Sequence, residues 1–531
     1  MKHYAKKAIA LTAALLTISA ASANVCAADA PTGDSMLRGN LNGDVKVSVE
    51  DAQLALSAAT AAVAGHETGL DEAVQPLADV DRDGDLTVKD AQCILRYYCL
   101  NTLSKADTDW DKVIIGERPE NQVPDADDIL SIISWTDDCV TPLIAHFTEA
   151  NPQYSGKIRY VNVGSSGGEA RELYASYFAG DEDADLFITE PEWMLDYINS
   201  DKYTRPVTDL GFSEADFDGC YSYTRDLGRD SSGSLKAVAW AVSPGAFVYR
   251  SDLAKEYLGV SSPEEMQPLV KDWDTFMDTA AKLKQASNGQ TAMIATRGDL
   301  AQPMIYSNHG VLLTPDEENP GSDKVTIPDA FKAFHTRMRT AINEKYYAAD
   351  HQWSEEWYEV GANGKSLGYF FTDWCLYEGS MLEQAETLEQ KAAYGKYRIT
   401  EGPAPWFWGG NFMALSNKTN SGSIAHDFIE HFVVNPETMK SYAEFSGEMV
   451  NNSWAMKQVK TPNPLLGGQS PFAALDRTAK KIDLKDVLAP KYFDLSYELS
   501  DSAIKKSRYE DAVKDFKEQA AKYENIVVYP D

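Results

Sequence analysis

One twelve-residue pattern occurs twice near the start of the chain, at residues 40–51 and 79–90, and each copy runs directly into Ala-Gln. Short oxygen-bearing side chains occupy positions 1, 3, 5, 9 and 12 of both copies, and position 7 would contribute a backbone carbonyl. A hard cation such as Ca²⁺ takes about six to eight oxygen ligands, which a tight loop with alternate side chains turned inward supplies. The pattern therefore predicts two calcium sites, with these ligand residues: Asn40, Asn42, Asp44, Lys46, Ser48, Asp51, Asp79, Asp81, Asp83, Asp85, Thr87 and Asp90.

Each loop leads into a helical pattern. Apolar residues keep helical spacing over residues 52–59 after the first loop and over residues 91–98 after the second. Position 12 is Asp in both copies, where the EF-hand loop has Glu. A loop followed by a helix, repeated once, closely resembles the type I dockerin over residues 36–110. That resemblance implies a small all-α calcium-binding unit whose partner is a cohesin domain on a scaffoldin or a cell surface.

The two loops differ in ways that predict unequal calcium affinity. Position 6 of the first loop is Val45, where the sharp turn calls for glycine, and position 1 is Asn40, which lacks the charge of an aspartate. The second loop keeps Gly84 and is expected to bind calcium more tightly. In dockerins the cohesin is recognised by loop positions 10 and 11 and by the helix just after them. The resemblance places that role here on Val49, Glu50, Ser57, Val88, Lys89 and Arg96, which differ between the repeats.

The ends and the charge of the chain predict export. Residues 1–28 have a basic start, an apolar run and small residues before an acidic stretch, which is typical of a secretory signal peptide cleaved after Ala23 or Ala28. The residues before Cys26 make a poor lipoprotein signal, and no later stretch is apolar for long enough to span a membrane. The formal net charge is −32, which argues against nucleic acid and anionic membrane as partners. We expect a secreted, extracellular or cell-surface protein.

A polar, proline-containing linker at residues 111–126 separates the repeats from residues 127–531, which are long enough for two lobes. Strand patterns at 129–135, 157–163 and 185–189 alternate with helical patterns, which favours a parallel sheet covered on both faces. Ligands of such sheets gather at the carboxyl ends of the strands. The residues at those ends are Trp135, Thr136, Asp137, Ser165, Ser166 and Glu190.

Several later segments, at 235–259, 271–284, 366–376 and 402–419, occur in an order that resembles the extracellular solute-binding proteins of ABC importers, in the maltose-binding-protein-like carbohydrate group. The resemblance implies an α/β two-lobed periplasmic-binding-protein-like fold of type II. Lobe 1 would take residues 127–240 and 410–455, and lobe 2 would take residues 241–409 and 456–531. It also implies an oligosaccharide ligand and an ABC permease as a further partner.

Aromatic rings fit the apolar face of a pyranose, while carboxylates and amides bond its hydroxyls. Five tryptophans fall on the segments that would line a sugar site, although any one of them could instead be a core residue. The residues added to the predicted ligand site are Trp240, Trp374, Trp406, Trp408 and Asn411. Trp273, Trp353 and Trp357 lie on helical patterns and are interpreted as structural.

Two other classes of function remain open at this stage. A glycosidase needs two carboxylates across one bond, and Asp137 with Glu190 could be nominated, but nothing in their setting marks such a pair. Residues 164–168 fit the G-x-S-x-G pattern of an esterase, but only one strand precedes them and the late histidines fall in a helical pattern. We expect no catalytic residues. The third possibility is a module that retains carbohydrate without a role in transport.

Overall fold

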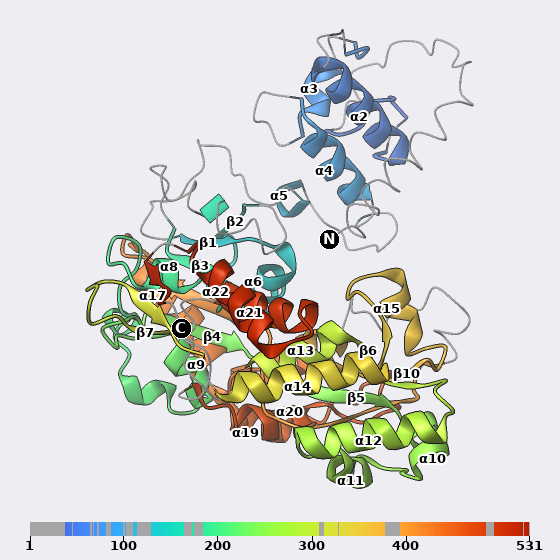
Figure 1. Cartoon of the computed structure of the whole chain (residues 1–531). Helices are drawn as coiled ribbons and strands as arrows, with labels where there is room; N and C mark the ends of the chain where they lie inside the picture. Colours follow the sequence, from blue (N-terminus) through green and yellow to red (C-terminus); the bar gives the residue numbers. More distant parts are fainter. Residues whose placement is uncertain are drawn as a thin grey trace. The chain divides into compact units, whose positions relative to one another are not determined.

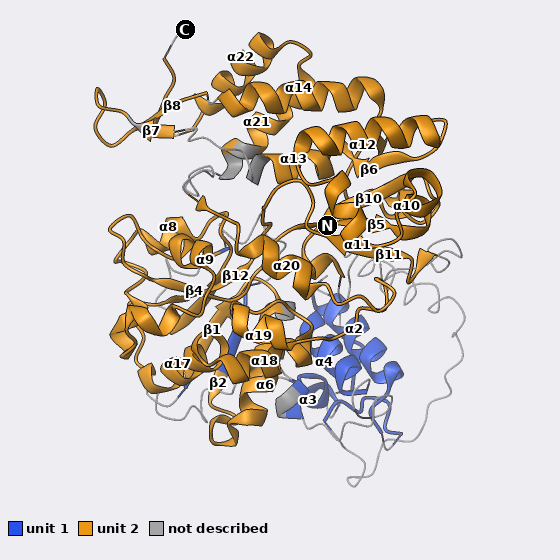
Figure 2. Ribbon diagram, turned by 90° about the horizontal axis from the view of Figure 1, so that it is seen from below, with its two compact units in different colours: residues 1–129, 159–173 blue, residues 130–158, 174–531 orange. Residues whose placement is uncertain are grey.

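The computed structural model describes residues 38–44, 46–63, 66, 68–71, 74–80, 86–98, 101, 110–113, 129–163, 173–174, 184–306, 313–327, 329–376, 393–484, 493–523 and 525–529. The expected leader at 1–28 and residues 114–126 of the expected linker lie outside these ranges. So do the predicted site residues Asp81, Asp83, Asp85, Ser165 and Ser166 and the side chain of Asp137. The chain divides into two compact units, residues 1–129 with 159–173 and residues 130–158 with 174–531 (Figure 2).

The first unit is helical. Its helices are α2 (Val49–Val63), α3 (Gln75–Ala78), α4 (Val88–Tyr98) and α5 (Trp110–Val113). The predicted loop-helix repeats correspond to α2 and α4, which pack against each other over a common apolar core. Val113 of α5 is buried in that core, and Trp110 stacks on Tyr97. Residues 111–113 are therefore folded, and the expected linker begins too early in the sequence because an amphipathic turn was taken for a polar connection.

The second unit contains two large sheets, each with its own set of helices (Figure 2). The first sheet includes, in order, β1 (Leu130–Ser134), β3 (Leu186–Thr189), β12 (Asn411–Leu415) and β4 (Ala237–Ala241). Strands β1 and β3 are parallel and almost fully buried, as expected for strands covered on both faces. Strand β12 is antiparallel to both of its neighbours, so the expectation of a wholly parallel sheet was wrong. It was wrong because β12 enters this sheet from the other lobe, far along the chain.

The second sheet runs in the order β11 (Tyr397–Thr400), β5 (Ala246–Arg250), β10 (Ser366–Phe371), β6 (Ala292–Thr296) and β9 (Tyr347–Ala349). Strand β10 pairs antiparallel with β5 and parallel with β6, so this sheet is also mixed. Helices α12 (Trp273–Ala286) and α13 (Arg297–Tyr306) pack on β6, and α20 (Phe472–Ala479) packs on β5 (Figure 1). A third, small sheet joins β13 (Ile526–Val527), β8 (Asp323–Val325) and β7 (Leu313–Pro315).

The remaining elements cover the sheets or connect their strands. Near the first sheet in sequence are β2 (Ile158–Asn162), α6 (Asp137–Ala150), η4 (Pro152–Tyr154), α8 (Leu195–Ile198), η5 (Val207–Leu210), η6 (Glu214–Phe217), α9 (Ser222–Leu227), α17 (Gly422–Ile429), η9 (Glu430–Val434), α18 (Pro436–Ser446) and α19 (Ser453–Gln458). The others are α10 (Ser251–Leu258), α11 (Pro263–Met266), η7 (Gln267–Leu269), α12 (Trp273–Ala286), α13 (Arg297–Tyr306), α14 (Asp329–Glu344), α15 (Glu355–Val360), η8 (Asp373–Leu376), α20 (Phe472–Ala479), α21 (Phe493–Lys505) and α22 (Tyr509–Ala520). None of the helices in the described ranges is both long and apolar enough to cross a lipid bilayer.

Extended segments cross between the two sheets and bond to one another. The Gly245 amide donates to the Trp406 carbonyl at 2.8 Å, and the Trp408 amide donates to the Ser243 carbonyl at 3.0 Å. A third segment joins them, because the Val242 amide donates to the Met449 carbonyl at 2.8 Å. The crossings therefore bring residues near 243, 407 and 449 to one place, although they are far apart in the sequence.

Candidate functional site

Three tryptophans from separate parts of the second unit meet beside these crossings. We call Trp353, Trp374 and Trp408 the aromatic cluster. The rings of Trp353 and Trp374 lie within 8° of parallel with centroids 6.3 Å apart. The ring of Trp408 is tilted by 59° against Trp353 and by 67° against Trp374, at centroid distances of 5.8 and 4.8 Å. Trp353 is 48% exposed and Trp374 is 39% exposed, and large aromatic rings exposed together indicate a binding surface.

Local structure explains why Trp374 faces outward. Strand β10 ends at Phe371, and the chain then turns into the short helix η8. Asp373 and Cys375, on either side of Trp374, are buried and anchor the turn. The Trp374 indole Nε1 donates to the Trp408 carbonyl at 3.2 Å, which joins the two rings. Trp374 therefore lies exposed just beyond a strand end, as the sequence predicted, and its contact with a ligand stays a prediction.

Trp408 lies between a buried crossing segment and two glycines with positive φ angles. The preceding Phe407 is buried and forms a bridge to Pro244. Gly409 and Gly410 follow with φ angles of 73° and 107°, in a region that side chains other than glycine seldom adopt. The turn directs the half-buried Trp408 ring toward Trp374, so this predicted residue belongs to the aromatic cluster.

Trp353 was interpreted as structural, and this was wrong: it is exposed and belongs to the aromatic cluster. Its φ angle is 65°, which is unusual for a bulky residue and indicates local strain held by the surroundings. Buried Asp299 fixes the chain before and after Trp353, because its carboxylate accepts from Gln352 Nε2 at 2.6 Å and from Trp357 Nε1 at 2.8 Å. Trp357 itself is fully buried, as expected of a structural residue.

Trp240 and Trp406 were expected to line the site, but both are fully buried. A Cβ placed on Gly245 would lie 1.8 Å from the Trp406 ring, so the indole rests directly on the glycine backbone. Trp240 points its Nε1 at Glu448 Oε2, at 3.3 Å. These two buried rings pack against the crossing segments and offer no free face to a ligand. The prediction failed because the burial of an indole on a crossing segment depends on which distant residues it meets.

Two carboxyl groups lie beside the aromatic cluster. Asp373 directly precedes Trp374, and its Oδ2 accepts from the Met449 amide at 3.0 Å. Burial raises the pKa of Asp373 to about 6, against the opposing effect of its hydrogen bonds. Burial first, and then repulsion from Asp373, raise the pKa of Glu448 to about 7. A carboxyl with a raised pKa in a ligand site is poised to exchange a proton or to meet a cation.

The other predicted residues of the site lie at the ends of strands in the first sheet. Glu190 follows β3, and burial of its carboxyl raises its pKa to about 8, with a further contribution from Glu192. A Cβ on Gly409 would lie 3.9 Å from Glu190 Oε1, which places this acid next to the turn after Trp408. The remaining described residues are partly exposed, with Trp135 and Thr136 between β1 and α6 and Asn411 at the start of β12.

The first predicted calcium loop turns alternate side chains toward its own backbone. Asn40 Oδ1 accepts from the Gly43 amide at 2.9 Å, Asn42 Oδ1 from the Asp44 amide at 3.0 Å, and Asp44 Oδ1 from the Lys46 amide at 3.1 Å. Such a loop gathers oxygen ligands at short sequence spacing, which is what a calcium ion requires. The residues present therefore fit the ion that the sequence implies.

The last aspartate of each loop has the same role in both repeats. Asp51 Oδ2 accepts from the Ser48 amide and hydroxyl, both at 2.8 Å, and Asp90 Oδ2 accepts from the Thr87 amide and hydroxyl at 2.8 and 3.2 Å. Both aspartates are fully buried in the first turn of a helix, and Asp79 directly follows α3. The two loops thus close onto α2 and α4 in the same way.

The residues that the dockerin resemblance assigns to cohesin recognition lie at or near the starts of these helices. Val49 begins α2 and Val88 begins α4, and Val88 is 46% exposed although it is apolar. Glu50, Ser57 and Arg96 are exposed, and Lys89 is partly buried. An apolar side chain left exposed at a helix start is available to a partner, but single exposed apolar residues are also common on monomers.

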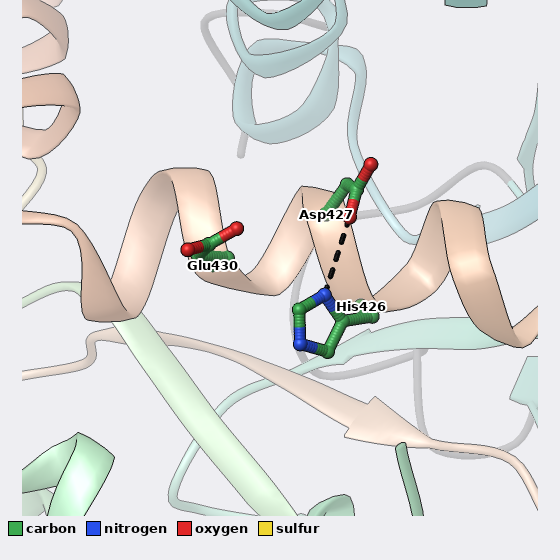
Figure 3. A group of neighbouring side chains, drawn as sticks. All are labelled: His426, Asp427 and Glu430. Carbon is green, nitrogen blue, oxygen red and sulfur yellow. Dashed lines mark hydrogen bonds and ion pairs between the residues drawn. The ribbon is translucent and has the colours of Figure 1, made fainter. Parts of the chain in front are cut away.

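One further cluster lies away from the aromatic rings. His426, Asp427 and Glu430 place potential metal ligand atoms within 4.8 Å of one another, and they are the only such group in the described part of the chain (Figure 3). His426 Nδ1 lies 3.2 Å from Asp427 Oδ1, and the Tyr154 hydroxyl donates to Asp427 Oδ2. Arg205 lines the same surface pocket as His426 and Asp427. With Asp427 engaged by two donors and a cation nearby, the cluster is read as structural.

Comparisons with known proteins are consistent with this architecture. Residues 142–455 match the profile of the bacterial extracellular solute-binding protein family. An extracellular solute-binding protein of family 1 aligns with a TM-score of 0.61 at 15% identity, over 74% of this chain and 98% of that chain. The sugar-binding protein MalE of Xanthomonas citri aligns with a TM-score of 0.58 at 16% identity, over 74% and 96%.

A third solved structure is the ABC-transporter-associated binding protein of B. animalis subsp. lactis in complex with beta-1,6-galactobiose. It aligns with a TM-score of 0.55 at 18% identity, over 74% of this chain and 97% of that chain. At these identities the likeness establishes the two-lobed fold. No curated protein matches the chain.

Proposed function

Because the chain belongs to the bacterial extracellular solute-binding proteins, we propose that its second unit binds an oligosaccharide outside the cell and releases it unaltered. The aromatic cluster is the observation that carries the proposal. Three tryptophans present ring faces at the crossings between two lobes, and two of them are substantially exposed. The apolar C–H face of a pyranose packs on such rings, while neighbouring polar groups bond its hydroxyls.

Transport supplies the second part of the proposal. Two of the structures that share the fold are a sugar-binding protein and a binding protein of an ABC transporter, which supports an importer as the partner of this chain. The basic and apolar leader at residues 1–28 fits export. Delivery to a permease and retention near the cell surface both require the same reversible binding, so the binding test comes first.

The test is a thermal-shift screen of the exported chain with gluco-, xylo-, manno- and malto-oligosaccharides, followed by calorimetry on each ligand found. A ligand that binds only the folded state raises the free energy of unfolding by about 3 kcal/mol at a hundredfold excess over Kd, and the melting temperature rises with it. Chromatography of the recovered sugar checks that it is intact. Turnover of the oligosaccharide, or no binding at millimolar concentration, would contradict the proposal.

We further propose that the first unit is a calcium-dependent docking module for a cohesin domain on a scaffoldin or a cell surface. Two loops with oxygen-bearing side chains at matching positions, each closed by an aspartate onto a helix, support this assignment. Binding of the chain to a panel of purified cohesins, with and without a calcium chelator, tests it. Chelator-insensitive binding, or none to any cohesin, would contradict a calcium-dependent dockerin.

No observation favours a hydrolase as a second function. The G-x-S-x-G segment at 164–168 and the side chain of Asp137 lie outside the described residues, so those hypotheses gain no support. His431 would be a poor general base for an esterase, because it is buried and bonded to His146 at 3.0 Å. Burial, and then His146 itself, lower the pKa of His431 to about 4.

A further inference from the structure

One oxygen beside the aromatic cluster lacks a donor. Asp373 is 3% exposed, and its Oδ2 accepts from the Met449 amide, but its Oδ1 has no hydrogen-bond partner among the described residues. A buried acceptor left unsatisfied costs about 1 to 3 kcal/mol, and more when the group is charged. Asp373 directly precedes the exposed Trp374 in η8, so its carboxyl belongs to the same turn as that ring.

A second and a third carboxyl share this neighbourhood. Glu448 precedes Met449 in the chain, and its carboxyl is close enough to Asp373 for the two charges to repel each other. Glu190 lies next to the turn that follows Trp408, as the 3.9 Å distance from a Cβ on Gly409 shows. None of these three acids forms an ion pair with a lysine or arginine in the described ranges.

Other acids of the same unit with little exposure are compensated. Asp230 pairs with the buried Lys236 at 3.0 Å, and Asp476 pairs with Lys480. Asp299 has no cationic partner but accepts from several donors at once, which satisfies both of its oxygens. Asp373 differs from these in having neither a cationic partner nor a donor for its Oδ1 among the described residues. Its missing partner is therefore expected to come from outside the chain.

We propose that the ligand of this site is a saccharide that carries a protonated amine, with its ring face on Trp374 and its ammonium group against Asp373 and Glu448. The inference rests on the proposed sugar-binding function and narrows its ligand class. An ammonium group donates to the unsatisfied oxygen, offsets the repulsion between the two acids and is attracted to the faces of nearby indoles. Neutral hydroxyls would donate hydrogen bonds but would leave the buried charges uncompensated.

Proton uptake gives the proposal a second readout. Burial raises the pKa of Asp373 to about 6 and that of Glu448 to about 7, so near neutral pH the empty site holds part of a proton. A bound cation favours the ionised carboxylates, so it lowers both pKa values and releases protons on binding. A neutral saccharide has no such preference. Calorimetry in two buffers of different ionisation enthalpy measures the number of protons released.

The experiment is calorimetry on the exported chain at pH 6.5 with four probes: a glucosamine trimer, the N-acetylglucosamine trimer, cellotriose and spermidine. We expect the glucosamine trimer to bind at least tenfold more tightly than either neutral trimer, with proton release. That preference should fall severalfold in Asp373→Asn and in Glu448→Gln. The control Glu518→Gln removes an exposed acid from the last turn of α22 and should leave the preference unchanged. Two separate acids are tested so that loss of folding in one variant leaves the other informative.

Equal affinity for the amine and the neutral trimers would overturn the inference and leave the sugar-binding function standing. Spermidine binding as tightly as the glucosamine trimer would also overturn it, because an amine alone would then account for binding without a sugar ring. An unchanged preference in both acid variants would show that the amine is recognised elsewhere. Binding of none of the three saccharides, here or in the wider oligosaccharide screen, would overturn the proposed function itself.

Discussion

The two units of this protein build their candidate sites in different ways. In the first unit the predicted ligand atoms come from a run of twelve residues, and the Leu41 and Asn42 amides donate to Asp51 Oδ1 at the other end of that run. In the second unit the site is assembled from Trp353, Trp374 and Trp408, which only the fold brings together. A local site can be recognised as a motif, whereas an assembled site leaves only scattered residues in the sequence.

The difference extends to how each unit is stabilised. The first unit has a small core built largely of alanines and short aliphatic residues, such as Ala55, Ala58 and Ile94. The second unit buries large aromatic side chains throughout both lobes, including Trp240 and Trp406. A small core gives little folding stability, so we expect the folding of the first unit to depend on bound calcium and the folding of the second unit not to.

The largest expected effect is therefore that of removing calcium. Chelation should abolish the cooperative unfolding transition of residues 38–113 and leave that of the second unit unchanged, because metal binding is coupled to local folding. Calorimetric scans with and without chelator measure both transitions. Asp90→Ala should act in the same direction, with Glu518→Gln as a control in the other unit. A first transition that survives chelation would remove the distinction between the units.

Truncating single tryptophans of the second unit tests the assembled site. Trp374→Ala should weaken oligosaccharide binding by about ten- to a hundredfold, since buried aromatic anchors carry roughly 1 to 3 kcal/mol, with little change in melting temperature. Trp406→Ala should instead destabilise the unit by about 3 to 5 kcal/mol, because it empties a buried site. Affinity and melting temperature are measured on both variants. The reverse pattern would assign Trp374 to the core.

Sequence reasoning succeeded where neighbouring residues determine structure. The strands expected at 129–135 and 185–189 correspond to β1 and β3 within one residue at their ends, because their apolar runs are long and bounded by polar residues. The resemblance to solute-binding proteins is confirmed, since it rested on the order of several segments. The dockerin and its calcium sites stay predictions.

Sequence reasoning failed where burial depends on distant partners. Trp406 and Trp408 stand two residues apart on the same crossing, yet one rests on Gly245 and the other is directed outward by Gly409. Trp353 was missed because its exposure depends on a left-handed backbone beside residues that Asp299 holds, and Asp299 lies far away in the sequence, in α13. The neighbouring Gly298, Gln352 and Trp357 give no local signal of this arrangement in the sequence.

A smaller effect is expected from pH, with opposite signs in the two units. Burial raises the pKa of Asp299 and of Asp373 to about 6, so each contribution to stability is fully present below about pH 4 and is lost as the pH rises through 6. His431 acts the other way, because its pKa is lowered to about 4 and its contribution is lost as the pH falls from about 6.5.

The second unit should therefore lose stability as the pH rises from about 4 to about 6, because the two carboxyls outweigh the single imidazole, and its free energy of unfolding should fall by roughly 1 to 3 kcal/mol over that range. The first unit should lose stability on acidification, because calcium ligands must be deprotonated. Urea unfolding at several pH values, followed separately for the two transitions, measures both slopes. Parallel pH profiles for the two units would contradict the assignment of the raised carboxyl pKa values.

The smallest effect concerns the difference between the two calcium loops. Val45 occupies position 6 of the first loop, where the sharp turn calls for glycine, while the second loop has Gly84 there. Val45→Gly should raise the calcium affinity of the first loop by about threefold to tenfold, since the change relieves a strain of roughly 1 kcal/mol. The matched change Asn40→Asp should add affinity through charge rather than through the backbone. Calcium titration of each variant, with the second loop left intact, measures the weaker of the two binding steps, which belongs to the first site. An unchanged affinity in Val45→Gly would show that the two loops differ through Asn40 alone.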